Sequence, residues 1–260
     1  MAYAGSHRAL LSGSAFLPQA QALFARFTTP PTQARKILIN RLITSLLSAG
    51  VWTKLDALYL FAAADAQAAS LNWLSANYTA IPVNSPTFVA DRGYTGDGAS
   101  SRLRTQYVPA TNGVNFTLND SSEWVYCLTD VDGAQADVGS TISGGQTQIQ
   151  SRRSSTQIGV SLNDATFGVV SSISTSIGLT GVSRTASNAR KTFRNGVQLG
   201  ATSTAASTSV TTAEQWVCAA NSAIFSTRQI AFAAWGGSLA GLEPALYTAV
   251  FTYLKAVGAA

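Results

Sequence analysis

The sequence predicts a mainly-β protein: an antiparallel β-sandwich with N-terminal helices and a C-terminal helix. From Thr87 onward, short runs of β-prone residues alternate with Gly, Asn, Asp and Ser turns at roughly eight to twelve residues, the spacing of a sandwich. Apolar residues at helical spacing precede and follow this region. The 260 residues suffice for one large all-β domain with an appendage.

The first clear element is a helix within "TTPPTQARKILINRLITSLLSAG". Thr29 and the pair Pro30–Pro31 mark its entry, because proline suits the first helical turn, and Gly50 ends it. Two neighbouring apolar stripes follow the helical period: Leu38, Leu42 and Leu46, and Ile39, Ile43 and Leu47. The segment from His7 to Phe27 is a weaker helix or an extended arm. We therefore divide the chain into residues 1–50, an arm and helix for docking or assembly, and residues 51–260, the sandwich with its closing helix.

The character of the sequence changes after residue 53. Apolar residues crowd together over 54–62, which favours a strand, and "DAQAASLNWLSA" then predicts a short helix capped by Asp65. A single helix over 53–76 is the alternative. Pro82 and Pro86 in "IPVNSP" break the chain again.

The strands of the sandwich are predicted from their composition and from the turns between them. They are "TFVAD", "SRLRTQYV", "SEWVYCLT", "QTQIQSRR", "TQIGVSL", "TFGVVSS", "IGLTGVSRT", "ARKTFRN", "VQLGA", "EQWVCAANS" and "RQIAFAAWGG". Asn195–Gly196 predicts a type I′ hairpin turn, because both residues tolerate positive φ. The final segment, "SLAGLEPALYTAVFTYLKAVG", has the helical period.

The composition favours an assembled protein. Charged residues make up 11% of the chain, against roughly 25% in ordinary domains, so few charges need desolvation when a surface is buried in a homo-oligomer. The net charge of +5 is scattered, with no polybasic run that would indicate nucleic acid. Three local basic pairs are read as solvated positions, with a patch for acidic polysaccharide as the alternative: Arg102 and Arg104, Arg152 and Arg153, and Arg190 and Lys191.

Cys127 and Cys218 lie in apolar contexts, which predicts buried free thiols, with a disulfide as the alternative. The N-terminus lacks a signal-peptide pattern, and the apolar stretch from Ile37 to Ala64 is broken by charges. We therefore expect a soluble protein made in the cytoplasm, without membrane insertion.

No reaction can be assigned from the residues. Glu123, Glu214 and Glu243 are isolated from second acids, whereas glycoside hydrolysis needs two carboxylates at a defined separation. His7 is the only histidine, and a catalytic triad would need it folded back onto the body. We therefore expect a protein that is not an enzyme, with no catalytic residue, cofactor or metal assigned and its ligand-binding residues unknown.

Two sets of residues suggest binding sites, and each set also has a simpler explanation. Asp130, Asp132 and Asp137 share one loop, which suggests Ca²⁺, but a tight turn at Asp132–Gly133 is favoured because the EF-hand pattern fails. Among the aromatic residues, the candidates for stacking on sugars are Tyr94, Tyr107 and Trp235. Aromatics alternating in strands are more often core residues.

Three segments together carry a family resemblance. "PTFVADRGYTGDGASSRLRT" resembles the opening of laminin-G-like, concanavalin-A-like jelly-roll domains encoded by bacteriophages and prophages, with an apolar strand before a G-D-G-x-S turn. "GVSRTASNARKTFRNGVQL" is similar to their middle hairpin, and "RQIAFAAWGGSLAGLEPALYTAVFTYLKAVG" to their closing strand and helix. The leader over 34–74 also looks like that of phage versions, so the resemblance covers roughly residues 30 to 258.

This resemblance implies a jelly-roll virion protein. It would be a structural component of a tail, fibre or baseplate or a head-surface decoration, with other virion proteins and copies of itself as partners. The alternative is a carbohydrate-binding adhesin or lectin module that recognises host polysaccharide. The catalytic residues of the glucanase branch have no matching positions here.

Overall fold

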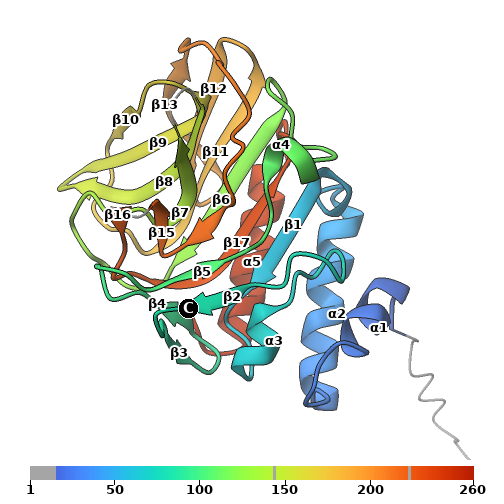
Figure 1. Ribbon diagram of the computed structural model, residues 1–260. Coiled ribbons are helices and arrows are strands. Elements are labelled where there is room, and N and C mark those ends of the chain that lie inside the picture. The colour runs from blue at the N-terminus through green and yellow to red at the C-terminus, as the bar shows by residue number, and fades with distance from the viewer. Residues whose placement is uncertain (1–15, 143–144, 222–223) are drawn as a thin grey trace, which may run out of the picture.

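The computed structural model describes residues 16–142, 145–221 and 224–260, and these form three layers (Figure 1). Two antiparallel sheets pack face to face, and the helices α1 (Pro18–Phe24), α2 (Gln33–Ser48) and α5 (Glu243–Ala256) cover the outer face of one of them. The predicted jelly-roll sandwich with N-terminal helices and a C-terminal helix is therefore confirmed. The boundary after residue 50 stays a prediction, as does the role of the segment before it.

The covered sheet, sheet A, has eight strands. Their order is β13 (Val197–Ser203), β12 (Ala189–Arg194), β11 (Gly178–Ala186), β6 (Ser121–Cys127), β17 (Gln229–Gly236), β4 (Gly93–Thr95) and β3 (Thr87–Val89), with β1 (Leu55–Leu60) also paired to β17.

The other sheet, sheet B, has seven strands. Their order is β10 (Gly168–Ser171), β9 (Gln157–Asp164), β8 (Gly145–Ser154), β7 (Val138–Ile142), β14 (Trp216–Val217), β5 (Arg102–Arg104) and β2 (Ile81–Val83). Short elements complete the described chain: η1 (Trp52–Lys54), α3 (Ala66–Ser70), α4 (Pro109–Asn112) and the hairpin of β15 (Ala219–Asn221) and β16 (Ile224–Phe225).

Sheet A takes part in two apolar cores because successive side chains of a strand point to opposite faces. On β6, Trp124 and Tyr126 pack against the helices, whereas Val125 and Cys127 pack between the sheets. Sheet B contributes only its inner face to the second core, through residues such as Leu103 and Val217. No helix within the described ranges covers its outer face, where a binding site can therefore form.

The predicted helices form, with one correction at the start of α2. Thr32 caps this helix, and its side chain accepts a hydrogen bond from the Arg35 amide at 3.3 Å. Pro30–Pro31 therefore precede the helix instead of forming its first turn, so the predicted entry at Thr29 is wrong. The strand predicted over 54–62 forms over 55–60. The cap at Asp65, which accepts from the Ala68 amide, is confirmed, but the helix that it starts ends at Ser70 instead of running through "LNWLSA". The single helix over 53–76 is excluded.

Most of the predicted strands also form, but "EQWVCAANS" is divided at Cys218, which has φ +64°, into β14 and β15. Several short strands were missed. The segment "IPVNSP", predicted only to break the chain, contains β2. Proline is compatible with β2 because this strand is the edge of sheet B and pairs only with β5. Strands β4, β7 and β16 were not predicted either.

The Asn195–Gly196 turn is confirmed. Both residues have positive φ, +49° and +79°, and the turn joins β12 to β13. A Cβ atom on Gly196 would lie 2.7 Å from the Cα atom of Pro244, at the start of α5. Glycine is therefore required both for the backbone conformation and for the packing of the hairpin tip on the helix.

Both cysteines are buried and free, as predicted. Among the described residues, no helix is both long enough and apolar enough to span a lipid bilayer.

Candidate functional site

The outer face of sheet B carries a hollow of about 380 Å³ that opens to solvent. Its lining combines an aromatic ring, charged groups and hydroxyls: Arg102, Arg104, Ser140, Thr141, Ala213, Glu214, Trp216 and Ala220. Strands β5, β7 and β14, which are neighbours in the sheet, supply most of these residues.

Strand alternation explains why these side chains reach the surface. Leu103 and Val217 point into the core between the sheets, so the adjacent Arg102, Arg104 and Trp216 point outward. Trp216 pairs directly with Arg104 on one side, which places the ring and the guanidinium next to each other in the sheet.

Gly139 is the neighbour of Trp216 on the other side. It has φ +133°, and a Cβ atom there would lie 2.2 Å from the carbonyl oxygen of Thr147. Glycine is therefore required beside Trp216 both by the positive φ and by the close approach of the β8 backbone.

The two arginines of the hollow have different environments. Arg104 pairs with Glu214 at 2.8 Å, and the two side chains are 47% and 14% exposed. Arg102 instead lies over the Trp216 ring, 4.2 Å from its centroid, in a cation–π contact. Since one glutamate faces two arginines, the lining keeps a net positive charge.

The predicted sugar-stacking aromatics lie elsewhere. Tyr94, Tyr107 and Trp235 are all buried in the core between the sheets, where they contact other aromatic rings. They cannot stack on a ligand at the surface. The alternative, that they are core residues, is confirmed, and Trp216 is the ring that sequence reasoning missed.

The three glutamates are separated in the fold. Glu214 lies in the hollow, and Glu243 at the start of α5 accepts from the Gly241 amide at 2.7 Å. Glu123 is fully buried and accepts from Trp235 Nε1 at 2.7 Å, while its second oxygen has no partner in the described chain. Burial raises the pKa of Glu123 to about 8, although the indole hydrogen bond opposes this shift. His7 lies outside the described residues.

The acidic loop that suggested Ca²⁺ surrounds an arginine instead. The Arg228 side chain is fully buried, pairs with Asp137 at 2.9 Å and donates to the carbonyl oxygens of Val131, Gly133 and Gln135. Asp130 pairs with Arg152 at 2.8 Å. The oxygens that a Ca²⁺ ion would need are therefore directed at guanidinium groups.

One basic pair was predicted incorrectly as solvated. Arg190 is 4% exposed and pairs with Asp164, which also pairs with the fully buried Arg184 at 2.8 Å. Burial raises the pKa of Asp164, and the two arginines oppose that shift. Arg153 lies over the Phe167 ring, 4.9 Å from its centroid.

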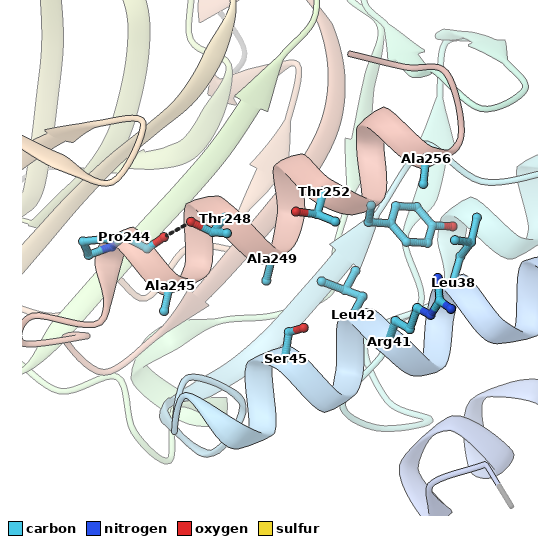
Figure 2. A pocket seen from close by; sticks show the side chains of 11 residues that line it. Leu38, Arg41, Leu42, Ser45, Pro244, Ala245, Thr248, Ala249, Thr252 and Ala256 are labelled. Atoms are coloured by element: carbon cyan, nitrogen blue, oxygen red, sulfur yellow. Dashed lines mark hydrogen bonds between the residues drawn. The ribbon is translucent and has the colours of Figure 1, made fainter. Parts of the chain in front are cut away.

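A second hollow, a groove of about 460 Å³ between α2 and α5, lies on the helical side of the molecule (Figure 2). In Figure 2, Leu42 and Ser45 of α2 face Ala245 and Ala249 of α5 across the groove. Arg41 is the only charged residue in this lining. This lining carries one charge and no acidic group, whereas the hollow on sheet B brings two arginines and a glutamate together. The hollow on sheet B is therefore the better candidate for binding a polar ligand.

Comparison with known proteins identifies solved structures of similar fold but no family. No family model and no curated protein matches the sequence. Among solved structures, Trypanosoma rangeli sialidase with sialic acid is similar at a TM-score of 0.54 and 9% identity, covering 82% of this chain and 39% of that chain. The same sialidase with 2,3-difluoro-KDN has a TM-score of 0.52 and 9% identity, and the match covers 84% of this chain and 39% of that chain. A mutant of HCR/D has a TM-score of 0.53 and 10% identity, and the match covers 76% of this chain and 52% of that chain. Our chain thus spans about two fifths to half of these proteins.

These likenesses correct one expectation. The sequence led us to expect a protein that is not an enzyme, but the fold is shared with chains of sialidases, which are enzymes. Isolated glutamates in the sequence are therefore no ground for excluding catalysis, and that expectation is withdrawn. At these identities the likeness establishes the fold and assigns no activity.

Proposed function

We propose that this protein binds carbohydrate in the hollow on the outer face of sheet B. The observation that carries the proposal is the half-buried Trp216 at a solvent-open hollow, with the guanidinium groups of Arg102 and Arg104, the Glu214 carboxylate and the Thr141 hydroxyl around it. An aromatic ring offers an apolar surface to the face of a sugar, which the Trp216 ring can do where Arg102 moves aside. The polar groups around the ring can bind sugar hydroxyls.

The fold likeness supports a carbohydrate ligand. The T. rangeli sialidase that shares this fold is bound to sialic acid in one of its structures. The hollow of our chain suits a short oligosaccharide in size, because ligand pockets commonly measure about 300–1,000 Å³ and this one measures about 380 Å³.

Replacing Trp216 is expected to weaken glycan binding strongly. Trp216→Ala should lower the affinity for the best glycan on an array by about thirtyfold or more, because truncating a central tryptophan commonly costs about 2 kcal/mol or more. Titration calorimetry measures the affinity, and circular dichroism checks the fold. Trp52→Ala, which truncates a half-buried tryptophan on the helical side, is the matched control and should bind normally. Equal losses in both variants, or wild-type binding by Trp216→Ala, would contradict the proposal.

Incubating the protein with the glycan that it binds also tests for hydrolysis. Release of reducing ends from that glycan would make the protein a hydrolase. If Glu214→Gln no longer released them, the carboxylate of the hollow would be assigned to the reaction. Binding without release would define a binding module.

We further propose that the module belongs to a phage particle and binds polysaccharide on the host surface. The three motif-bearing segments and the low fraction of charged residues support this. Mass spectrometry of purified particles is expected to find the protein in many copies. Its absence from the particles would overturn the virion assignment and leave glycan binding untouched.

A further inference from the structure

The hollow on sheet B holds a positive charge that no acidic side chain neutralises. Arg104 is paired with Glu214, whereas Arg102 forms no ion pair with any residue that the structure describes. Its one protein acceptor is the carbonyl oxygen of Ser100, which receives a hydrogen bond from Nη1 at 3.0 Å. The Nε atom is buried and has no partner in the described part of the chain. Arg102 therefore keeps a full charge at the lining, with no described carboxylate to balance it.

The turn before β5 holds Arg102 in place. The Asp97 carboxylate accepts hydrogen bonds from the amides of Ala99, Ser100 and Ser101 at 2.7 to 2.9 Å. This closes the D-G-A-S turn and fixes the Ser100 carbonyl that binds Arg102. The turn motif seen in the sequence thus positions the cation of the hollow.

The contact with Trp216 leaves the guanidinium able to bind an anion. A guanidinium is planar and its N–H donors lie in that plane, so a ring against one face does not block them. A carboxylate matches this arrangement of donors and can accept two hydrogen bonds at once. A neutral sugar that displaced Arg102 from the Trp216 ring would not neutralise the charge of the guanidinium, whereas an acidic sugar would supply a counterion.

We propose that the ligand is an acidic glycan, whose uronic acid residue places its carboxylate on Arg102 and its ring near Trp216. This rests on the proposed carbohydrate binding and names the substrate class of the same hollow. Because Arg102 is half-buried, the pairing is less screened by salt than a fully exposed pair.

The test compares uronate oligosaccharides (galacturonate, glucuronate and mannuronate) with their carboxyl-reduced forms, which have the same linkages without the charge. The wild-type protein is expected to bind at least one acidic form about tenfold more tightly than its reduced form. In Arg102→Gln this preference should disappear, so that the acidic form and its reduced form bind with equal affinity. Arg153→Gln is the matched control, because Arg153 also lies over an aromatic ring but outside the hollow.

The outcomes separate the two proposals. Equal affinity for acidic and reduced forms, or saturable binding of neutral glycans alone, would overturn the acidic ligand and leave carbohydrate binding intact. A preference that survives in Arg102→Gln would overturn the role of Arg102. No saturable binding to any glycan would overturn the proposed function itself.

Discussion

Arg228→Met is expected to destabilise the protein by about 3–5 kcal/mol, the usual effect of removing one partner of a buried ion pair. The substitution keeps an unbranched apolar stem but leaves Asp137 without its counterion in the interior. It also removes the donors for the carbonyl oxygens of Val131, Gly133 and Gln135. Thermal unfolding should show a fall in Tm of roughly 10 °C, since 1 kcal/mol corresponds to about 2–4 °C in a chain of this size.

Arg41→Met is the control for this experiment, because Arg41 is exposed on α2 and its loss should change the stability by less than about 0.5 kcal/mol. The same measurement with added Ca²⁺ or EDTA should leave the Tm of the wild-type protein unchanged, since Arg228 occupies the position that a cation would need. Stabilisation by Ca²⁺, or a harmless Arg228→Met, would contradict this account of the loop.

Glu123 is expected to make the protein less stable as the pH rises. The pKa of Glu123 is about 8 in the folded protein, against an ordinary value of 4.5. Between these values the folded protein keeps a proton that the unfolded chain has lost, so the free energy of unfolding falls as pH rises. The loss is complete above about pH 8 and is on the order of 4 kcal/mol.

Glu123→Gln should remove this dependence, because the amide stays neutral at every pH and its oxygen can still accept from Trp235. Urea unfolding at pH 5 and pH 9 should show similar stability for both proteins at pH 5 and greater stability for the variant at pH 9. Glu243→Gln is the control, which removes a different buried glutamate, and it should keep the wild-type slope because Glu123 is still present. Identical slopes for wild type and Glu123→Gln would show that Glu123 is not the group responsible.

The parts of the fold that the sequence predicts are those in which local periodicity agrees with tertiary packing. Helices α2 and α5 and the hairpin of β12 and β13 follow directly from apolar spacing and from Asn195–Gly196. The missed strands lack such signals: β2 contains Pro82 and β7 contains Gly139. Their extended conformation comes from hydrogen bonds to neighbouring strands that are distant in the chain.

The site was harder to predict than the fold. Trp216 stands between a glutamine and a run of apolar residues, so it reads as a core residue, and β14 is too short to show alternation. The one available signal was the Arg-Leu-Arg sequence at 102–104, which places two cations on one face of a strand. That these cations lie beside Trp216 depends on the register between β5 and β14, which no local pattern specifies.

The alternation along β6 has a consequence for cooperativity. Trp124 and Tyr126 belong to the core beneath the helices and Val125 and Cys127 to the core between the sheets, all on one hydrogen-bonded strand in the middle of sheet A. Melting the helical layer would expose one side of this strand to water and weaken the hydrogen bonds that hold its other side in place. The two cores are therefore coupled through a shared backbone, so helices and sandwich should be lost in a single transition.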